Sequence, residues 1–395
     1  MNEPTFVPKR LTEARVAAGL SRSSLADVCQ LSAQSICSYE TGLRFPSPST
    51  LRILADNLML PSRYFISSRP SDSGAAGTTF FRSQMSARTR REYDRRAQTA
   101  IWAGEIGTWI DRYVKLPSVN LLDVNIDEEL NSDAIDQITT SLREFWGLGS
   151  GPVGNLVRLL ESKGITVVKQ TFESQKVDAF SRIVLGRPYV FLSHNKSSYV
   201  RSRFDAAHEL GHLIMHQHIT NSDLERSGVL SRIEREANLF AASFLMPASS
   251  FPRELYGTTL QSFINLKPRW KVSVQAMIMR ASDLGVISDA QKSSLMTQIA
   301  AKGMRVIEPL DNELKAEEPM LFRKAWEVIV DNRVRPVTAI SDDLALRPEF
   351  IAGVLHIPAD RLVVETDISN IIPFTLKPQG GLSRDIDLSN LPTAS

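Results

Sequence analysis

The sequence of 395 residues is 43% hydrophobic and 23% charged, the composition of an ordinary globular protein long enough for two or three domains. No apolar run approaches the roughly 20 residues that cross a bilayer, and no signal-peptide core opens the chain. We therefore expect a cytoplasmic protein without membrane contact. The two cysteines, Cys29 and Cys37, exclude a disulfide framework. The net charge is only +2, but residues 1–115 hold 16 Lys/Arg against 10 Asp/Glu. This basic third suits a polyanion such as double-stranded DNA.

Residues 1–68 carry four short helical patterns. Serines stand where the second and third patterns begin, and a serine hydroxyl there can accept a hydrogen bond from a free main-chain N–H of the first turn. The patterns lie at residues 11–20, 22–29, 33–39 and 50–58, and the capping serines are Ser21 and Ser32. Two short helices joined by a tight turn, with one more on each side, match a DNA-binding helix-turn-helix.

The residue spacing of this region resembles the XRE, or lambda-repressor, type of helix-turn-helix. The matching segments are Ser21-x-x-x-Leu25-Ala26, Ile36-x-x-Tyr39-Glu40-x-Gly42-x-x-x-Pro46 and Leu51-x-x-Leu54-Ala55-x-x-Leu58. Two positions depart from the type. Arg22 replaces a common glutamine, and Gln30 replaces the usual turn glycine, so the turn is less free to adopt a positive φ.

The third helix would then be the recognition helix, with Gln34, Ser35 and Ser38 facing the DNA. Glutamine can pair with adenine through two hydrogen bonds, and serine can contact bases or phosphates. Arg22 and Arg44 could hold the phosphate backbone. Modules of this type usually bind as dimers, so we expect a homodimer. A module that binds only protein is the alternative.

Residues 69–79 are rich in Ser, Gly and Ala and predict a linker. A helical connector follows over residues 80–146 and begins with one long amphipathic helix or two shorter ones. Its arginines are interleaved with acids, which favours a solvated face over a second DNA contact. Trp102 and Trp109 are seven residues apart, and we interpret them as packing residues rather than a base-stacking platform.

Residues 165–169, 179–185 and 189–192 predict three strands, which follow helices over 133–146 and 155–163. We expect a small sheet. An edge strand of such a sheet can hold an extended peptide through main-chain hydrogen bonds.

The segment His208-Glu209-x-x-His212 carries the strongest chemical signal. In a helix the two histidines lie one turn apart on the same face and can bind a single Zn²⁺. Glu209 can reach the open position of that metal and accept a proton from water. Five letters with two wildcards also match by chance. However, four of the six histidines cluster at positions 208, 212, 216 and 218.

The next helical pattern, which stops at Pro247, offers a third ligand. On a helical wheel Glu234 lies at the border of the apolar face, whereas Glu236 points well away from it. A carboxylate that borders a buried face needs a partner. We therefore predict that Glu234 is the third ligand and keep Glu236 as the alternative ligand. Either glutamate could instead be a solvated surface residue without a metal.

His-Glu-Leu-Gly-His, followed by Glu-x-x-Ala-Asn-x-Phe-Ala-x-x-x-Leu-Met-Pro, resembles the ImmA/IrrE group of zincin metallopeptidases over roughly residues 140–285. The resemblance implies zinc bound by His208, His212 and Glu234, with Glu209 as the base. Members typically cleave a helix-turn-helix repressor, often after stress or DNA damage. We expect His216, one turn beyond His212, to support the ligands rather than bind the metal.

The expected fold is mainly α with a small β-sheet. The helix-turn-helix bundle, linker and connector precede a zincin-like α+β domain over 147–285 and a helical or mixed C-terminal domain over 286–395. That last domain has two short helices around Pro348 and a mobile tail from Pro378. The leading functional hypothesis is a DNA-tethered zinc endopeptidase that cuts a repressor-type protein in a stress or mobile-element response. The alternatives are a regulator whose zincin-like domain senses a ligand or metal without cleavage, and self-cleavage at the linker.

Overall fold

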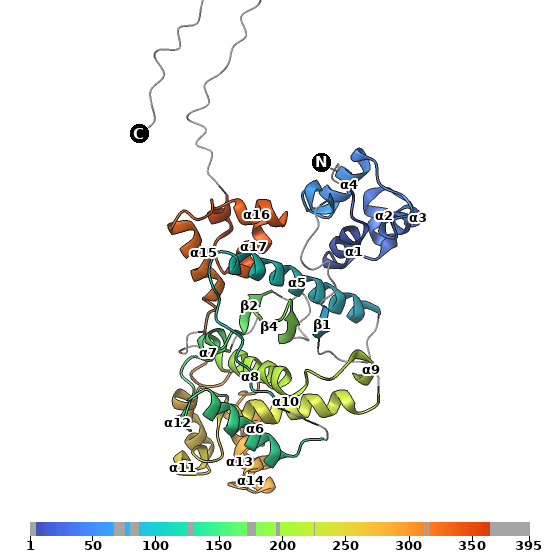
Figure 1. Cartoon of the computed structure of the whole chain (residues 1–395). Coiled ribbons are helices and arrows are strands. Elements are labelled where there is room, and N and C mark those ends of the chain that lie inside the picture. Colours follow the sequence, from blue (N-terminus) through green and yellow to red (C-terminus); the bar gives the residue numbers. More distant parts are fainter. Residues whose placement is uncertain are drawn as a thin grey trace, which may run out of the picture. The chain divides into compact units, whose positions relative to one another are not determined.

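The computed structural model of the chain describes residues 5–66, 76–79, 87–124, 126, 129–171, 179–194, 198–224, 226–311, 313 and 316–363 (Figure 1). Helices dominate and the strands form one small sheet, which confirms the predicted fold class. Most of the expected linker and the whole tail from Pro378 lie outside the described residues. Among the described helices, none combines the length and the apolar character that a membrane span requires.

The N-terminal part forms a helix-turn-helix. Its elements are α1 (Pro8–Ala17), α2 (Arg22–Cys29), α3 (Ala33–Glu40), α4 (Pro48–Asn57) and the 3-10 turn η1 (Ser62–Ile66). Ser21 caps α2 and Ser32 caps α3, as predicted, because each hydroxyl accepts a main-chain N–H three residues on at 3.0 Å. Gln30 ends α2 with a φ of 53°, in the left-handed region. Gln30 therefore adopts the left-handed backbone conformation that glycine adopts readily, which for a residue with a Cβ atom costs about 1–2 kcal/mol of folding free energy.

The sheet has four strands in the order β1-β3-β4-β2. Three of them were predicted: β2 (Thr166–Gln170), β3 (Ala179–Val184) and β4 (Arg187–Ser193). β4 pairs antiparallel with β3 and parallel with β2. The sequence did not predict β1 (Ala76–Thr79), which falls in the expected linker and pairs antiparallel with β3.

Both outer strands of the sheet have partners. β1 covers the side of β3 that faces away from β4. At the opposite edge, Nε2 of His356 accepts a hydrogen bond from the main-chain N–H of Lys169 on β2, at 3.0 Å. An unpaired strand edge is a template for association with other chains. β1 therefore covers the edge that β3 would otherwise expose, and His356 occupies one main-chain donor at the edge of β2.

The sheet separates two hydrophobic cores. Alternate strand residues face opposite sides, so Phe191 belongs to one core and its neighbour Val190 to the other. α5 (Ala87–Asp111), a single 25-residue helix, lies over the first core. Trp102 and Trp109 of this helix are buried there. Their expected role in packing is confirmed.

The connector helix also contacts the helix-turn-helix. The indole N–H of Trp102 donates a hydrogen bond to the hydroxyl of Tyr64 at 3.1 Å. Arg96, one of the arginines expected on a solvated face, is instead buried and paired with Glu92 at 2.5 Å. The solvated-face prediction therefore fails at Arg96, whereas Arg91 is exposed.

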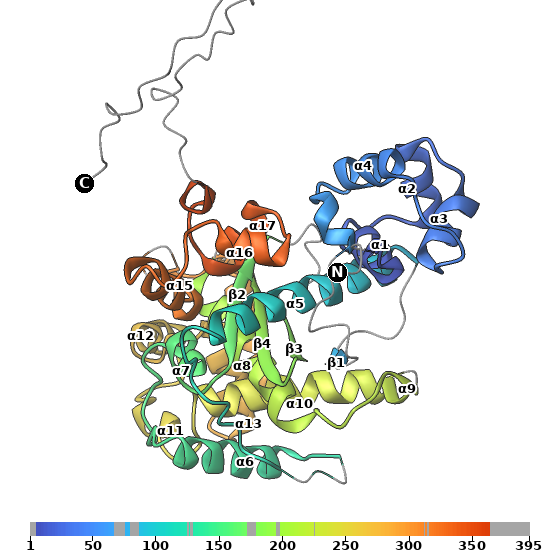
Figure 2. The ribbon, with the colours of Figure 1, turned by 45° about the horizontal axis from the view of Figure 1, so that its top comes forward.

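The second core lies on the other face of the sheet, where α8 (Tyr199–Met215) packs against β3 and β4, and α10 (Val229–Leu245) packs against α8 (Figure 2). Leu295 and Ile299 extend this core beyond residue 285, the expected end of the zincin-like domain. The other helices around this core are α6 (Ser132–Phe145), α7 (Leu156–Ser162), α11 (Phe251–Glu254), α12 (Leu260–Trp270), α13 (Val274–Asp283) and α14 (Asp289–Ala301). α9 (Asn221–Leu224) packs instead in a small third cluster with Ile233 of α10.

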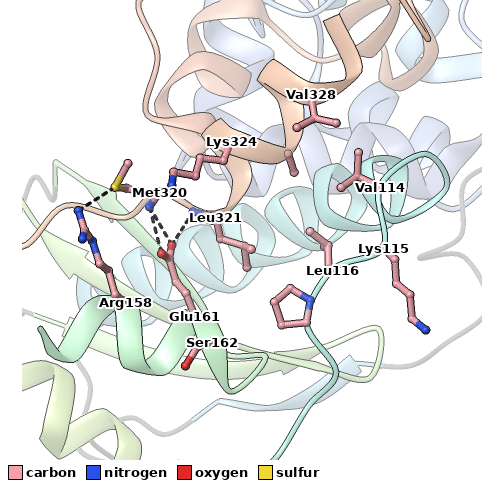
Figure 3. Close-up of a pocket in the computed structure, with 12 residues that line it drawn as sticks. Val114, Lys115, Leu116, Arg158, Glu161, Ser162, Met320, Leu321, Lys324 and Val328 are labelled. Atoms are coloured by element: carbon pink, nitrogen blue, oxygen red, sulfur yellow. Dashed lines mark hydrogen bonds between the residues drawn. The ribbon is translucent and has the colours of Figure 1, made fainter. Parts of the chain in front are cut away.

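The last described helices pack in the first core, with α5 and the sheet. They are α15 (Leu321–Asp331), α16 (Ala339–Leu344), α17 (Pro348–Leu355) and the 3-10 helix η3 (Ala359–Leu362). α16 and α17 confirm the two short helices predicted around Pro348. Glu161 of α7 accepts the main-chain N–H groups of Met320 and Leu321, each at 3.0 Å, at the start of α15 (Figure 3). The region after residue 285 thus contributes to both cores.

Candidate functional site

Two packed helices carry the candidate metal ligands. The structure places His208 and His212 on α8 and Glu234 on α10. These helices approach closely because residue 211 is glycine. A Cβ atom at Gly211 would lie 3.0–3.2 Å from side-chain atoms of buried Phe240, tighter than ordinary contact. The glycine therefore allows α10 to bring Glu234 next to the histidines.

The three side chains converge on one point. The Nε2 atoms of His208 and His212 are 3.0 Å apart, and oxygens of Glu234 lie 3.6 Å from the first and 3.8 Å from the second. In a tetrahedral Zn²⁺ shell with bonds of about 2.0–2.1 Å, neighbouring ligand atoms are about 3.3 Å apart. The residues therefore fit a zinc set of two histidines and one carboxylate. Such a set leaves a fourth position for water or substrate.

The outer ring nitrogens of both histidines are hydrogen-bonded. Nδ1 of His208 donates to Oδ1 of Asn238 at 3.0 Å, since an amide oxygen only accepts. Nδ1 of His212 lies 3.0 Å from Nδ1 of His216, whose Nε2 lies 2.9 Å from a carboxylate oxygen of Glu236. Because the carboxylate takes the hydrogen of His216 Nε2, His216 Nδ1 must accept from His212. Both ligand histidines thus turn an Nε2 lone pair toward the site.

Two lone pairs at 3.0 Å repel each other unless a positive ion lies between them, and the electrostatics of the site reflect this. Burial lowers the pKa of His208, but the carboxylate of Glu234, 3.6 Å from Nε2, and the charge of Glu209 outweigh burial and raise the pKa overall. Burial, followed by the charges of His208 and His216, holds the pKa of His212 well below its ordinary value. The site therefore favours one cation between the rings, either a proton or a metal.

Glu236, the alternative ligand, lies away from the metal position and has another role. It is buried on α10, accepts the hydrogen of His216, and accepts the main-chain N–H of Leu130 at 3.1 Å. Sequence reasoning placed Glu236 away from the apolar face and missed this connection. The four-residue step from His212 to His216 signals only the contact between those two rings and carries no information on Glu236.

Glu209 lies beside the ligands and is only 6% exposed. Burial raises its pKa to about 7, while the charge of His208 acts in the opposite direction. The hydroxyl of Ser181 on β3 donates a hydrogen bond to the main-chain oxygen of Glu209 at 3.5 Å, so the sheet contacts the backbone of α8 at this residue. A carboxylate with a pKa near neutrality can both take and return a proton. Its location suits a general base.

Comparison with known families gives two matches. The model of the IrrE N-terminal-like domain, a peptidase family, matches residues 160–282, and that of a helix-turn-helix domain matches residues 9–63. The chain carries a helix-turn-helix domain joined to an IrrE-like domain. The resemblance drawn from the sequence is therefore confirmed. A search of curated proteins finds no match.

The IrrE-like match runs from α7 to α13 and includes every residue of the candidate metal centre. A separate apolar hollow of about 380 Å³ lies between α7, α15 and the chain after α5 (Figure 3). Its lining residues include no metal ligand candidate, and its carboxylate, Glu161, caps α15. We therefore place the chemistry of the IrrE-like domain at the metal centre.

The helix-turn-helix domain presents the predicted contact residues on and just after α3. Gln34 is exposed, and Ser35 and Ser38 are half-buried on the same helix. The hydroxyl of Ser35 shares a hydrogen bond with that of Ser32 at 2.9 Å. Arg44 is exposed in the loop that follows. These positions form one accessible surface.

Arg22, predicted to contact phosphates, also has a structural role. Its Nε donates to the carboxylate of Glu40 at 2.6 Å, and Nε of Arg15 donates to the same carboxylate at 2.5 Å. Glu40 is buried at the end of α3, so the two arginines connect α1 and α2 to α3. The side chain of Arg22 is nevertheless 49% exposed.

Proposed function

We propose that this chain is a DNA-binding regulator whose IrrE-like domain is a zinc-dependent endopeptidase. The convergence of His208, His212 and Glu234 around one point, with buried Glu209 beside them, carries the proposal. Two imidazoles and one carboxylate are a typical catalytic zinc set, because a fourth position stays open. The family match supports the peptidase assignment.

In this proposal His208, His212 and Glu234 hold the metal. When bound, Zn²⁺ supplies Lewis-acid activation of water and of the peptide carbonyl. Glu209 accepts the proton of the attacking water and returns it to the leaving amine, a role that a pKa near 7 permits. Asn238 orients the ring of His208 by its hydrogen bond.

The helix-turn-helix domain would bring this activity to DNA. We propose that α3 reads an operator through Gln34, Ser35 and Ser38, with Arg44 and the exposed part of Arg22 on phosphates. The chain would bind as a homodimer and cleave a repressor-type protein in a stress or mobile-element response. Binding at the operator would raise the local concentration of such a substrate.

The catalytic part is tested with the zinc-loaded full chain and two substrates, a casein peptide pool and a purified repressor of the XRE type. The wild type should cleave at least one of them. Glu209→Gln should keep the bound zinc, since Glu209 is not a ligand, and lose cleavage. Equal cleavage by the wild type and Glu209→Gln would rule out Glu209 as the general base. A wild type that holds zinc and regulates transcription without cutting either substrate would favour the non-cleaving sensor.

The DNA-binding part is tested by selecting duplexes from a random pool. Gln34→Ala should weaken binding to the selected sequence by about 1–3 kcal/mol and relax the preference at one base pair. Arg44→Ala should weaken binding to all duplexes alike and flatten the salt dependence. A chain that selects no duplex would indicate a module that binds only protein.

A further inference from the structure

A groove of about 680 Å³ opens beside the candidate metal centre. Its lining residues on α10 extend from Ser231 to Ala242, roughly 16 Å of helix at 1.5 Å per residue. α8 contributes Phe204, and α13 contributes Ala276 and Met279. The volume lies within the range of about 300–1,000 Å³ that is common for ligand sites.

The groove is continuous with the metal centre. Glu234 lines the groove and is also a ligand candidate, and Asn238 lines it while it holds the ring of His208. Phe204 lies one helical turn before His208, on the same face of α8. A peptide whose carbonyl lies at the metal can therefore place a neighbouring side chain in the groove.

The lining sets the chemistry of that side chain. Most of the surface is apolar, and Met279 remains 42% exposed although methionine usually packs inside. The polar groups at the border include the acids Glu234 and Asp283. Arg235, the basic residue among those that line the groove, is ion-paired with Glu129. The groove thus offers burial to an apolar group, and among the described lining residues Asp283 is the one acid that is not a metal-ligand candidate.

We propose that this groove is the subsite for a large apolar side chain next to the scissile bond, and that the IrrE-like domain selects leucine, methionine or phenylalanine there. The inference rests on the proposed peptidase function and specifies its substrate. The apolar lining of the groove provides the selectivity for a large apolar side chain. An acidic side chain gains nothing from such a surface, because burial without a partner destabilises its charge.

Metal-chelating peptide analogues test the subsite without requiring turnover. Acetohydroxamate contacts only the metal, so its binding to the zinc-loaded full chain reports the open coordination position. Two series then carry glycine, alanine, leucine or glutamate beside the chelator. In one series the hydroxamate ends the peptide, and in the other a malonyl hydroxamate precedes it, so that both sides of the metal are sampled. Dissociation constants are measured by calorimetry.

In one of the two series we expect leucine to bind at least 10-fold more tightly than alanine. Each methylene removed from water contributes about fourfold, so three additional carbons give up to about 50-fold. Glutamate should bind no better than glycine. Met279→Gln should remove most of the leucine preference, and Ala276→Trp, which fills the groove, should abolish it. Met59→Gln, the same change at a remote exposed methionine, is the matched control.

The outcomes separate the subsite from the proposed function. If acetohydroxamate does not bind, the chain lacks an open zinc position and both proposals fail. If it binds but neither series prefers leucine, the subsite is refuted and the metal centre stands. A leucine preference that survives both groove variants also refutes the subsite. If Ala276→Trp does not fold, Met279→Gln alone decides, because an exposed polar replacement is compatible with folding.

Discussion

Replacement of His216 by phenylalanine is expected to weaken zinc binding by about 10- to 100-fold, the usual effect of losing a partner that orients a metal ligand. The structure supplies the reason. His216 accepts from His212 at 3.0 Å and donates to Glu236 at 2.9 Å, and it is only 2% exposed. Phenylalanine leaves the His212 N–H without an acceptor. His212 can then move its hydrogen to Nε2, where it blocks the ligand lone pair.

The expected loss corresponds to about 1.4–2.7 kcal/mol of binding free energy. It is measured by chelator competition on the full chain, with the Co²⁺ absorption spectrum as a second readout. His216→Gln should restore most of the affinity, because an amide can accept from His212 and donate to Glu236. His218→Phe, at an exposed histidine two residues away, is the control. Thermal unfolding of the metal-free variants separates a ligand-orienting role from a general loss of stability.

Zinc binding by His216→Phe as tight as that of the wild type would refute an orienting role of His216. The same conclusion would follow if His216→Gln bound zinc as weakly as His216→Phe while both metal-free variants unfolded at the wild-type temperature. In that case the hydrogen bonds of the imidazole would not set the ligand geometry.

Gly211→Ala should lower both the free energy of unfolding and the zinc affinity. Crowding of the new methyl group against Phe240 costs about 1–3 kcal/mol, whereas the better helix propensity of alanine contributes only about 1 kcal/mol. A stabilised variant with unchanged zinc affinity would contradict this expectation. Gln30→Gly should stabilise the chain by about 0.5–1 kcal/mol in denaturant unfolding, because glycine adopts a φ of 53° without strain. Burial lowers the pKa of His356 to about 4. The unfolded chain therefore binds a proton that the folded chain refuses, and stability should fall by up to about 3 kcal/mol as the pH drops from 6.5 toward 4. His356→Gln should flatten that fall in melting curves recorded against pH, and an unchanged slope would assign it to other groups.

The convergence of His208, His212 and Glu234 was predictable because much of its geometry is local. The step from His208 to His212 fixes their common face on any helix, and the wheel position of Glu234 brings it to the border of the buried face. No such rule links Glu236 to His216, because they lie on different helices and their contact depends on how α8 and α10 pack. Their connection needed the structure.

The remaining differences also have physical causes. β1 has no alternation of apolar residues, and only its pairing with β3 makes the segment a strand. The pairing of Arg22 with Glu40 joins residues 18 positions apart, so helical periodicity does not reveal it. The groove beside the metal combines residues of α8, α10 and α13. The sequence of no single one of these helices predicts the shape of the groove.

The pairing of β1 with β3 bears on how this protein can be divided. A fragment that began at residue 87 would keep the metal ligands but would lose β1, and with it the cover on the outer side of β3. Backbone N–H and C=O groups exposed in this way invite neighbouring molecules to add strands. A shortened version made for crystallisation or enzymology would therefore tend to self-associate, and its precipitation would reflect a missing neighbour rather than a failure to fold.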